Sequence, residues 1–260
     1  MTYALLLLLV FAWLPLQAME VDIQAEKTWW QYREYAKDAV LTAIQASFLP
    51  SKVQGDGIQV QLSFSSNREE DWFFALSGAW MSSITKAAEQ WNTIQHNDIA
   101  IQQWDIRCDA QYAVMRHARL GVFWAGRRQE QSRENFVVHG LQVDVAGEPI
   151  VEDIRSSWLG LSFVGTGGVS QQLEVSIDLA VPLQVEVINP LFATPFGQRS
   201  GYRTALGFRW SLPKSEVAIS GLSLLFHYQY QELGGEHQTN GSFWPYNRWQ
   251  MLGFGVLYAW

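Results

Sequence analysis

Much of the chain alternates between apolar and polar side chains at every second residue. In 58–66 the residues Ile58, Val60, Leu62 and Phe64 are separated by glutamines and serines, and 172–187 repeats the pattern over eight apolar positions. A period of two is that of a β-strand, whose successive side chains point to opposite faces. Ten such stretches are predicted as strands: 38–48, 58–66, 72–80, 99–113, 119–127, 153–164, 172–187, 202–212, 216–231 and 247–260.

The last stretch carries the most specific signal. One parity holds Leu252, Phe254, Val256, Tyr258 and Trp260, and the other holds Gly253, Gly255, Leu257 and Ala259. One face is therefore bulky and the other small, and the chain stops on an aromatic residue. This strand resembles the closing strand of the Gram-negative outer-membrane β-barrel proteins, whose last residue is typically Phe or Trp.

The resemblance implies an all-β fold, a transmembrane antiparallel up-and-down β-barrel in the cell outer membrane, reached by export through the periplasm. It also implies two sets of partners. Outer-membrane lipid and lipopolysaccharide would surround the barrel, and the outer-membrane assembly machinery would read Tyr258 and Trp260.

The lengths of the connections agree with a count of ten. With the C-terminus in the periplasm, the periplasmic turns fall near 67–71, 114–118, 165–170 and 212–215, and all are short. The opposite connections are long, except the first, which we interpret as a turn around Gly55-Asp56-Gly57. Short periplasmic turns and longer extracellular loops are typical of such barrels. The range is eight to twelve strands, because 137–145 also alternates and fits either a hairpin arm above the membrane or two additional strands.

The N-terminus has the pattern of an export signal. An apolar run from Ala4 to Leu14 ends at Pro15, and Ala18 suits a signal-peptidase site, although no Lys or Arg precedes the run. We expect a signal peptide over 1–18, with a buried N-terminal helix as the alternative. Residues 19–37 are predicted to be a periplasmic lead-in, in which Trp29, Tyr32 and Ala36 have helical spacing, with a strand that begins at Trp30 as the alternative. Residues 38–260 are predicted to be the barrel.

Composition narrows the class further. A net charge of −7 without a basic stripe argues against a nucleic-acid partner. The single cysteine, Cys108, excludes an intramolecular disulfide and fits a small strand residue. No other apolar run is long enough for a helical span. The 13 Trp, 14 Phe and 9 Tyr suit the aromatic girdles of a membrane barrel.

The polar faces of the predicted strands carry ions of both signs, which is more typical of a lumen than of a water-exposed surface. Buried in a narrow barrel, such charges must be paired. They either close the lumen as a salt-bridge network or line a narrow pore. The candidate lumen residues are Asp105, Arg107, Asp109, Arg119, Glu174, Asp178, Glu186, Arg203, Arg209 and His227.

Motifs for chemistry are sparse. The five histidines form no metal-spaced cluster, and no nucleotide-binding or nucleophile-elbow motif occurs, so we predict no metal, cofactor or catalytic residues. Ten strands is also the count of the omptin proteases, and His96, His139 and His237 fall in predicted outer loops, but no stretch matches omptin motifs. Lipid hydrolases of the outer membrane need a lipid-facing His, whereas His227 has the lumen parity.

Three functions follow from these patterns. The first is a structural or surface-interaction barrel with a largely plugged, charge-lined lumen, which is not an enzyme. The second is a narrow channel for small polar solutes, since ten strands enclose too little space for a wide porin. The third is a hydrolase with a site at the extracellular rim.

Overall fold

The computed structural model describes residues 19–35, 50–67, 70–145, 147, 149–168, 172–191, 195–198, 200–212, 221–237 and 243–260. The expected signal peptide (1–18), the first expected strand (38–48) and the turn at 213–215 lie outside these residues. The described part of the chain contains no helix long and apolar enough to cross a membrane.

The described residues form β-strands of very different lengths. The strands are β1 (Glu20–Tyr35), β2 (Ser51–Ser65), β3 (Trp72–Ser83), β4 (Ala87–Trp91), β5 (Gln95–Met115), β6 (Ala118–Val138), β7 (Leu141–Gln142), β8 (Ile150–Gly167), β9 (Leu173–Ile188), β10 (Phe196–Gln198), β11 (Gly201–Ser211), β12 (Leu222–Leu233), β13 (Glu236–His237), β14 (Phe243–Trp244) and β15 (Tyr246–Ala259).

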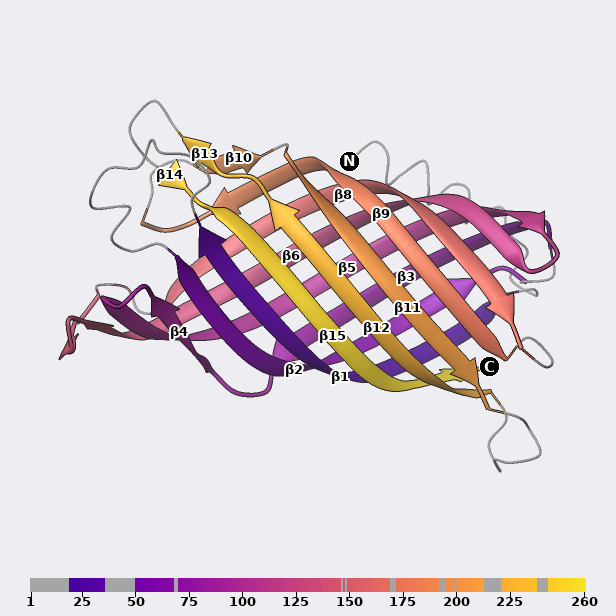
Figure 1. Ribbon diagram of the computed structural model, residues 1–260, viewed down its shortest axis with the longest axis horizontal. Helices are drawn as coiled ribbons and strands as arrows, with labels where there is room; N and C mark the ends of the chain where they lie inside the picture. The colour runs from indigo at the N-terminus through magenta and orange to yellow at the C-terminus, as the bar shows by residue number, and fades with distance from the viewer. Residues whose placement is uncertain are drawn as a thin grey trace.

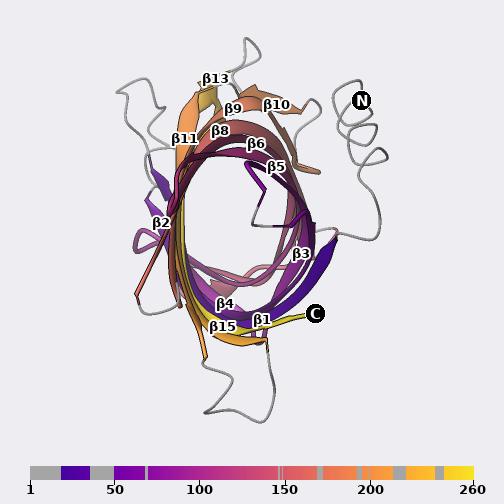
Figure 2. The same cartoon turned by 90° about the vertical axis from the view of Figure 1, so that its right-hand side faces the viewer.

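The long strands form a closed antiparallel barrel of ten strands (Figure 1, Figure 2). Neighbours follow one another in the order β1, β2, β3, β5, β6, β8, β9, β11, β12 and β15, and β15 pairs with β1 to close the ring. An even strand count puts the start of β1 and the end of β15 at the same end, which we call the terminal end. The opposite end, where β4, β10, β13 and β14 gather, is the loop end (Figure 1).

The first strand of the barrel is β1, so the prediction of a lead-in over 19–37 was wrong. Every residue from Asp22 to Tyr35 has a register partner on β15, and the barrel begins at Glu20 rather than at 38. The inward face of β1 mixes acids with aromatics, among them Glu26, Trp30 and Tyr32. This mixture hid the period of two, while Trp29 and Tyr32 suggested a helix. The predicted count of ten is confirmed, with a different first member.

The expected turn at Gly55-Asp56-Gly57 was also wrong, because β2 continues through it. A Cβ at Gly55 would overlap the indole of Trp30, and one at Gly57 would press on Ser82 O of β3. These glycines make room for neighbours inside a strand instead of turning the chain. The alternating stretch 137–145 forms the hairpin of β6 with β7, turned by His139 and Gly140 at positive φ, so it adds no barrel strand.

The outer surface of the barrel is an apolar belt of the outward-facing residues. It includes Val60 and Leu62 on β2, Leu159, Leu161 and Phe163 on β8, Ile177, Leu179 and Val181 on β9, and Phe254 and Val256 on β15. Cys108 lies on this outward parity of β5 as a buried free thiol. Strands β5 and β6 have 21 residues each, whereas about ten span a bilayer, so the barrel extends beyond the belt at the loop end.

Candidate functional site in the lumen

The lumen changes character along its length, and β6 shows the change on one strand. Its inward residues run from Arg119 near the terminal end through Phe123, Arg127 and Gln131 to Arg133. Arg119 is half-buried, whereas Gln131 is fully buried and Arg133 is 6% exposed. The terminal half of the lumen therefore admits water and the loop half does not.

Two apolar clusters fill the loop half from opposite walls. One includes Trp30 and Trp249, whose rings stack at 5.5 Å between centroids. The other includes Trp158, whose Nε1 donates to Ser156 Oγ at 2.9 Å, and Phe196, which packs against Trp244. Because protein interiors of this kind pack closely, the ring of ribbons seen in Figure 2 is filled with side chains at this level.

Arg133 lies between these clusters and joins three carboxylates from three other strands. Its guanidinium contacts Glu89 of β4 at 2.7 Å, Glu34 of β1 at 3.1 Å and Glu152 of β8 at 3.5 Å. Tyr32 donates to Glu34 at 2.7 Å, and Asn97 donates to Glu89 at 2.9 Å. Because these groups are almost fully buried, the network is a dry cross-link across the barrel.

A second polar layer lies toward the terminal end. Arg127 of β6 contacts Asp105 of β5 at 2.7 Å and donates to Gln231 and Gln229 of β12 at 3.2 and 3.1 Å. Arg203 of β11 donates to the same Gln229 oxygen at 3.1 Å. This layer ends the closed half of the lumen.

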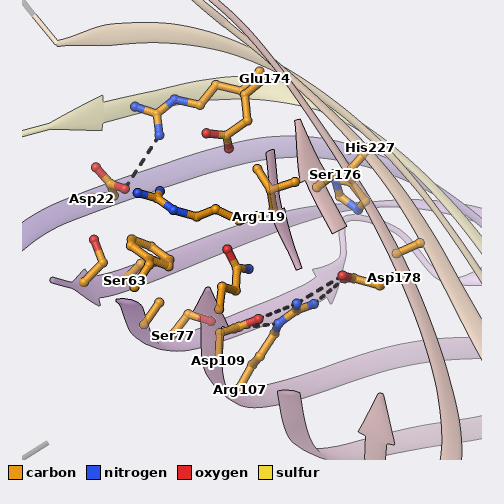
Figure 3. Close-up of a pocket in the computed structure, with 18 of the residues that line it drawn as sticks. Asp22, Ser63, Ser77, Arg107, Asp109, Arg119, Glu174, Ser176, Asp178 and His227 are labelled. Atoms are coloured by element: carbon orange, nitrogen blue, oxygen red, sulfur yellow. Dashed lines mark hydrogen bonds and ion pairs between the residues drawn. The ribbon is translucent and has the colours of Figure 1, made fainter. Parts of the chain in front are cut away.

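Below it lies a cavity of about 1100 Å³. Its lining includes Arg116 and His117 of the β5–β6 turn together with Asp71, so it opens at the terminal end. Among the described residues its wall carries nine carboxylates and five arginines. We call this cavity the vestibule; Figure 3 shows part of its lining.

Arg107 spans the vestibule from β5. Its guanidinium lies 2.6 Å from the carboxylate of Asp109 on the same strand, and it also forms an ion pair with Asp178 of β9 on the opposite wall (Figure 3). Its guanidinium also lies 4.0 Å from the ring centroid of Phe123. The arginine is thus held by charge and by the face of an aromatic ring.

His227 of β12 and Glu26 of β1 form a pair across the intervening strand β15, with 2.6 Å between Nδ1 and Oε2. Gly253 of β15 lies between them, and a Cβ there would meet both side chains. The absence of a side chain at Gly253 therefore leaves room for Glu26 and His227 to meet over β15. Ser176, Gly207, His227 and Gly253 form one register row across β9, β11, β12 and β15.

The structure brings together nine of the ten residues predicted for the lumen. Those lining the vestibule are Asp105, Arg107, Asp109, Arg119, Glu174, Asp178, Arg203, Arg209 and His227. Arg209 lies 3.9 Å from Asp22, and its Nε donates to Ser223 Oγ at 3.2 Å.

Glu186 is the exception, and its prediction was wrong. Ser157 of β8 pairs with Gln184 and Trp158 pairs with Pro182, so Leu183 is an extra residue in β9. Such a bulge reverses the parity of everything beyond it. Val185 and Val187 consequently point inward as buried residues, and Glu186 points outward opposite Arg155.

The Arg133 network was not predicted from the sequence. Arg133 was assigned to an outer loop, and Glu34 to the lead-in. Both residues are ions at inward positions of long strands. This pattern can be recognised only when β1 is known to be a strand and β6 is known to extend to Val138. At the rim, His96 and His139 are exposed, and no group of acids, histidines and cysteines among the described residues is arranged to hold a metal ion.

The chain is similar in structure to several solved bacterial outer-membrane proteins. The chain is similar to the outer membrane protease OmpT from Escherichia coli, with a TM-score of 0.50, 9% identity, and coverage of 94% of this chain and 97% of that one. The translocator domain of the autotransporter NalP from Neisseria meningitidis gives 0.41 at 10% identity, covering 99% and 94%. Ail, the attachment invasion locus protein of Yersinia pestis, gives 0.36 at 8%, covering 94% and 99%.

No protein-family model matches the sequence, and no curated protein matches it. At 9% identity the likeness to OmpT shows a shared fold alone. The fold is that of the outer-membrane β-barrels.

Proposed function

We propose that this chain is a bacterial outer-membrane barrel with a structural or surface-interaction role, whose lumen is closed toward the cell exterior. The apolar belt supports the membrane location, because so large an exposed apolar surface would be costly in water. The short connections 66–71 and 116–117 lie at the terminal end, as do the periplasmic turns of such barrels. In this orientation the vestibule faces the periplasm.

One observation carries the proposal that the barrel does not conduct. The inward side chains of the loop half are almost completely buried, from Ile99 and Ile101 on β5 to Gln131 and Arg133 on β6. A hydrated ion passing through would have to displace stacked tryptophans and break the contacts of Arg133 with three carboxylates. Both changes carry a large free-energy cost.

Planar-bilayer recording of the purified, refolded chain tests this proposal, with heat-modifiable gel mobility as the control for folding. We expect a folded barrel without discrete conductance steps. Steps whose ion selectivity changes in Arg203→Ala or Asp178→Ala would instead support the narrow channel, which the charged lining of the vestibule favours. A chain that is soluble without detergent and fails to fold in it would contradict the membrane location.

A further inference from the structure

The outer surface carries a row of cations where β15, β1 and β2 leave the apolar belt. Arg33 of β1 has Arg248 of β15 as its register partner on one side and Lys52 of β2 on the other. The three side chains share the outward parity of belt residues such as Leu252, Trp29 and Ile58. We call Arg248, Arg33 and Lys52 the basic row.

Three like charges on adjacent strands are unfavourable unless an anion compensates them, because side chains directly opposite one another are only about 5 Å apart at Cβ. Arg248 contacts Glu232 of β12 at 3.4 Å, and Tyr230 donates to that same carboxylate at 2.8 Å. The Nε atoms of Arg33 and Arg248 are both buried without a hydrogen-bond partner in the described part of the chain. The row thus presents more positive charge and more donors than Glu232 satisfies.

Tyrosines flank the basic row on the same face. Tyr35 lies 6.0 Å from Tyr246, and Tyr202 lies 5.5 Å from Tyr230, between ring centroids. Arg248 contacts the faces of Tyr35 and Tyr230 at 5.4 and 5.5 Å. Tyrosines above an apolar belt mark the level of lipid headgroups, and guanidinium groups held in place by rings are suited to planar contacts with phosphate.

A second pair of outward cations, on β6 and β8, lacks this excess. Arg128 contacts Glu130 at 2.6 Å and Asp153 at 3.1 Å, and Arg155 contacts Asp153 at 2.8 Å with Glu186 as its register partner. Acids therefore compensate the arginines on that side. Both clusters have cations at the edge of the same belt, but among the described residues the arginines on β6 and β8 are matched by acids, whereas the basic row has more cations than acids.

We propose that the basic row binds the phosphate groups of an anionic lipid in the outer leaflet. Arg33 and Arg248 would donate to the phosphate oxygens, Lys52 would add a point charge, and the tyrosines would contact the rest of the headgroup. The inference rests on the proposed outer-membrane location and adds to it a specific lipid site on one side of the barrel.

The test is binding of lipid A, a bis-phosphorylated glycolipid, by the refolded full-length chain in neutral detergent, measured by native mass spectrometry over a titration. We expect Arg33→Ala and Arg248→Ala each to weaken binding about tenfold, the value of one charge-assisted hydrogen bond to phosphate. The matched control is the double variant Arg128→Ala with Arg155→Ala, which also removes two outward arginines and should change binding by less than about twofold. Heat-modifiable mobility reports whether each variant folds.

Each alternative has a distinct result. If the control double variant and the double variant Arg33→Ala with Arg248→Ala lose the same amount of lipid A affinity, the binding is general charge attraction and the specific site is overturned. If a dephosphorylated glycolipid binds equally well, the phosphate groups have no role in binding. If inorganic phosphate at an equal concentration displaces lipid A, the site binds free phosphate rather than a lipid headgroup. These results leave the barrel proposal standing, whereas failure of the wild-type chain to fold in detergent overturns both.

Discussion

The two halves of the lumen contain the same types of charged residues, but one half is closed to water and the other is open to it. Near the loop end, one arginine and three carboxylates are buried between two apolar clusters, and water is excluded. Near the terminal end, Arg107 and its two aspartates line a cavity of about 1100 Å³. The difference lies in what surrounds the ions. In the loop half, apolar side chains pack around the ion pairs and close the lumen to water. In the terminal half, small residues such as Ser77, Ala79 and Gly207 leave similar ion pairs accessible to water.

Thiol labelling should give the largest contrast between the halves. Ser77→Cys of the vestibule and Ser156→Cys of the closed half are matched substitutions, made in a Cys108→Ala background. A buried thiol reacts only after local opening, so we expect labelling by a membrane-impermeant maleimide to be about a hundredfold slower at position 156. Comparable rates would mean that water reaches the loop half and that the lumen is not sealed.

Removing the central arginine of each half should separate them by stability. Arg133→Ala leaves three buried carboxylates without their shared cation, and we expect a loss of about 3–5 kcal/mol in the free energy of unfolding. Arg107→Ala is the control, because water can replace the guanidinium at Asp109 and Asp178, and its loss should be about 1–2 kcal/mol. Urea unfolding in lipid vesicles measures both. Similar losses would contradict the contrast between a dry and a hydrated network.

Filling the space above Gly253 should have a smaller effect. In Gly253→Ala the new methyl group would force Glu26 and His227 apart, at a cost of about 1–3 kcal/mol in unfolding free energy. Gly78→Ala is the control, since a Cβ there has Asp105 O at 4.0 Å as its nearest neighbour and should change stability by less than about 0.5 kcal/mol. If both glycines tolerate alanine equally, the small face of β15 has another cause.

The pair of Glu26 and His227 should contribute the least, because the histidine lies in the hydrated vestibule. We expect Glu26→Gln and His227→Gln each to cost about 1 kcal/mol. Because the two residues share one interaction, the double variant should cost little more than either single one. Strict additivity in the unfolding free energies would show that the two side chains do not interact.

Much of this architecture could be predicted from local alternation. The period of two predicts nine of the ten barrel strands, because a half-buried strand needs it in the sequence, but it ends β6 at 127 instead of Val138 and starts β2 at 58 instead of Ser51. It also assigns nine lumen residues to the correct face. Where one face mixes charges with aromatics, as with Glu26, Trp30 and Tyr32 of β1, the period disappears and the strand was missed.

The sequence by itself determined nine of the ten barrel strands, the faces of most of their residues and the small residues on the inner side of the closing strand. Tertiary structure decided that β1 closes the barrel against β15, that Leu183 bulges and turns Glu186 outward, and that Arg107 finds Asp178 across the lumen. The reason is physical. Alternation is a property of neighbours along the chain, whereas closure, bulges and contacts across a lumen depend on strands that meet only when the ring is complete.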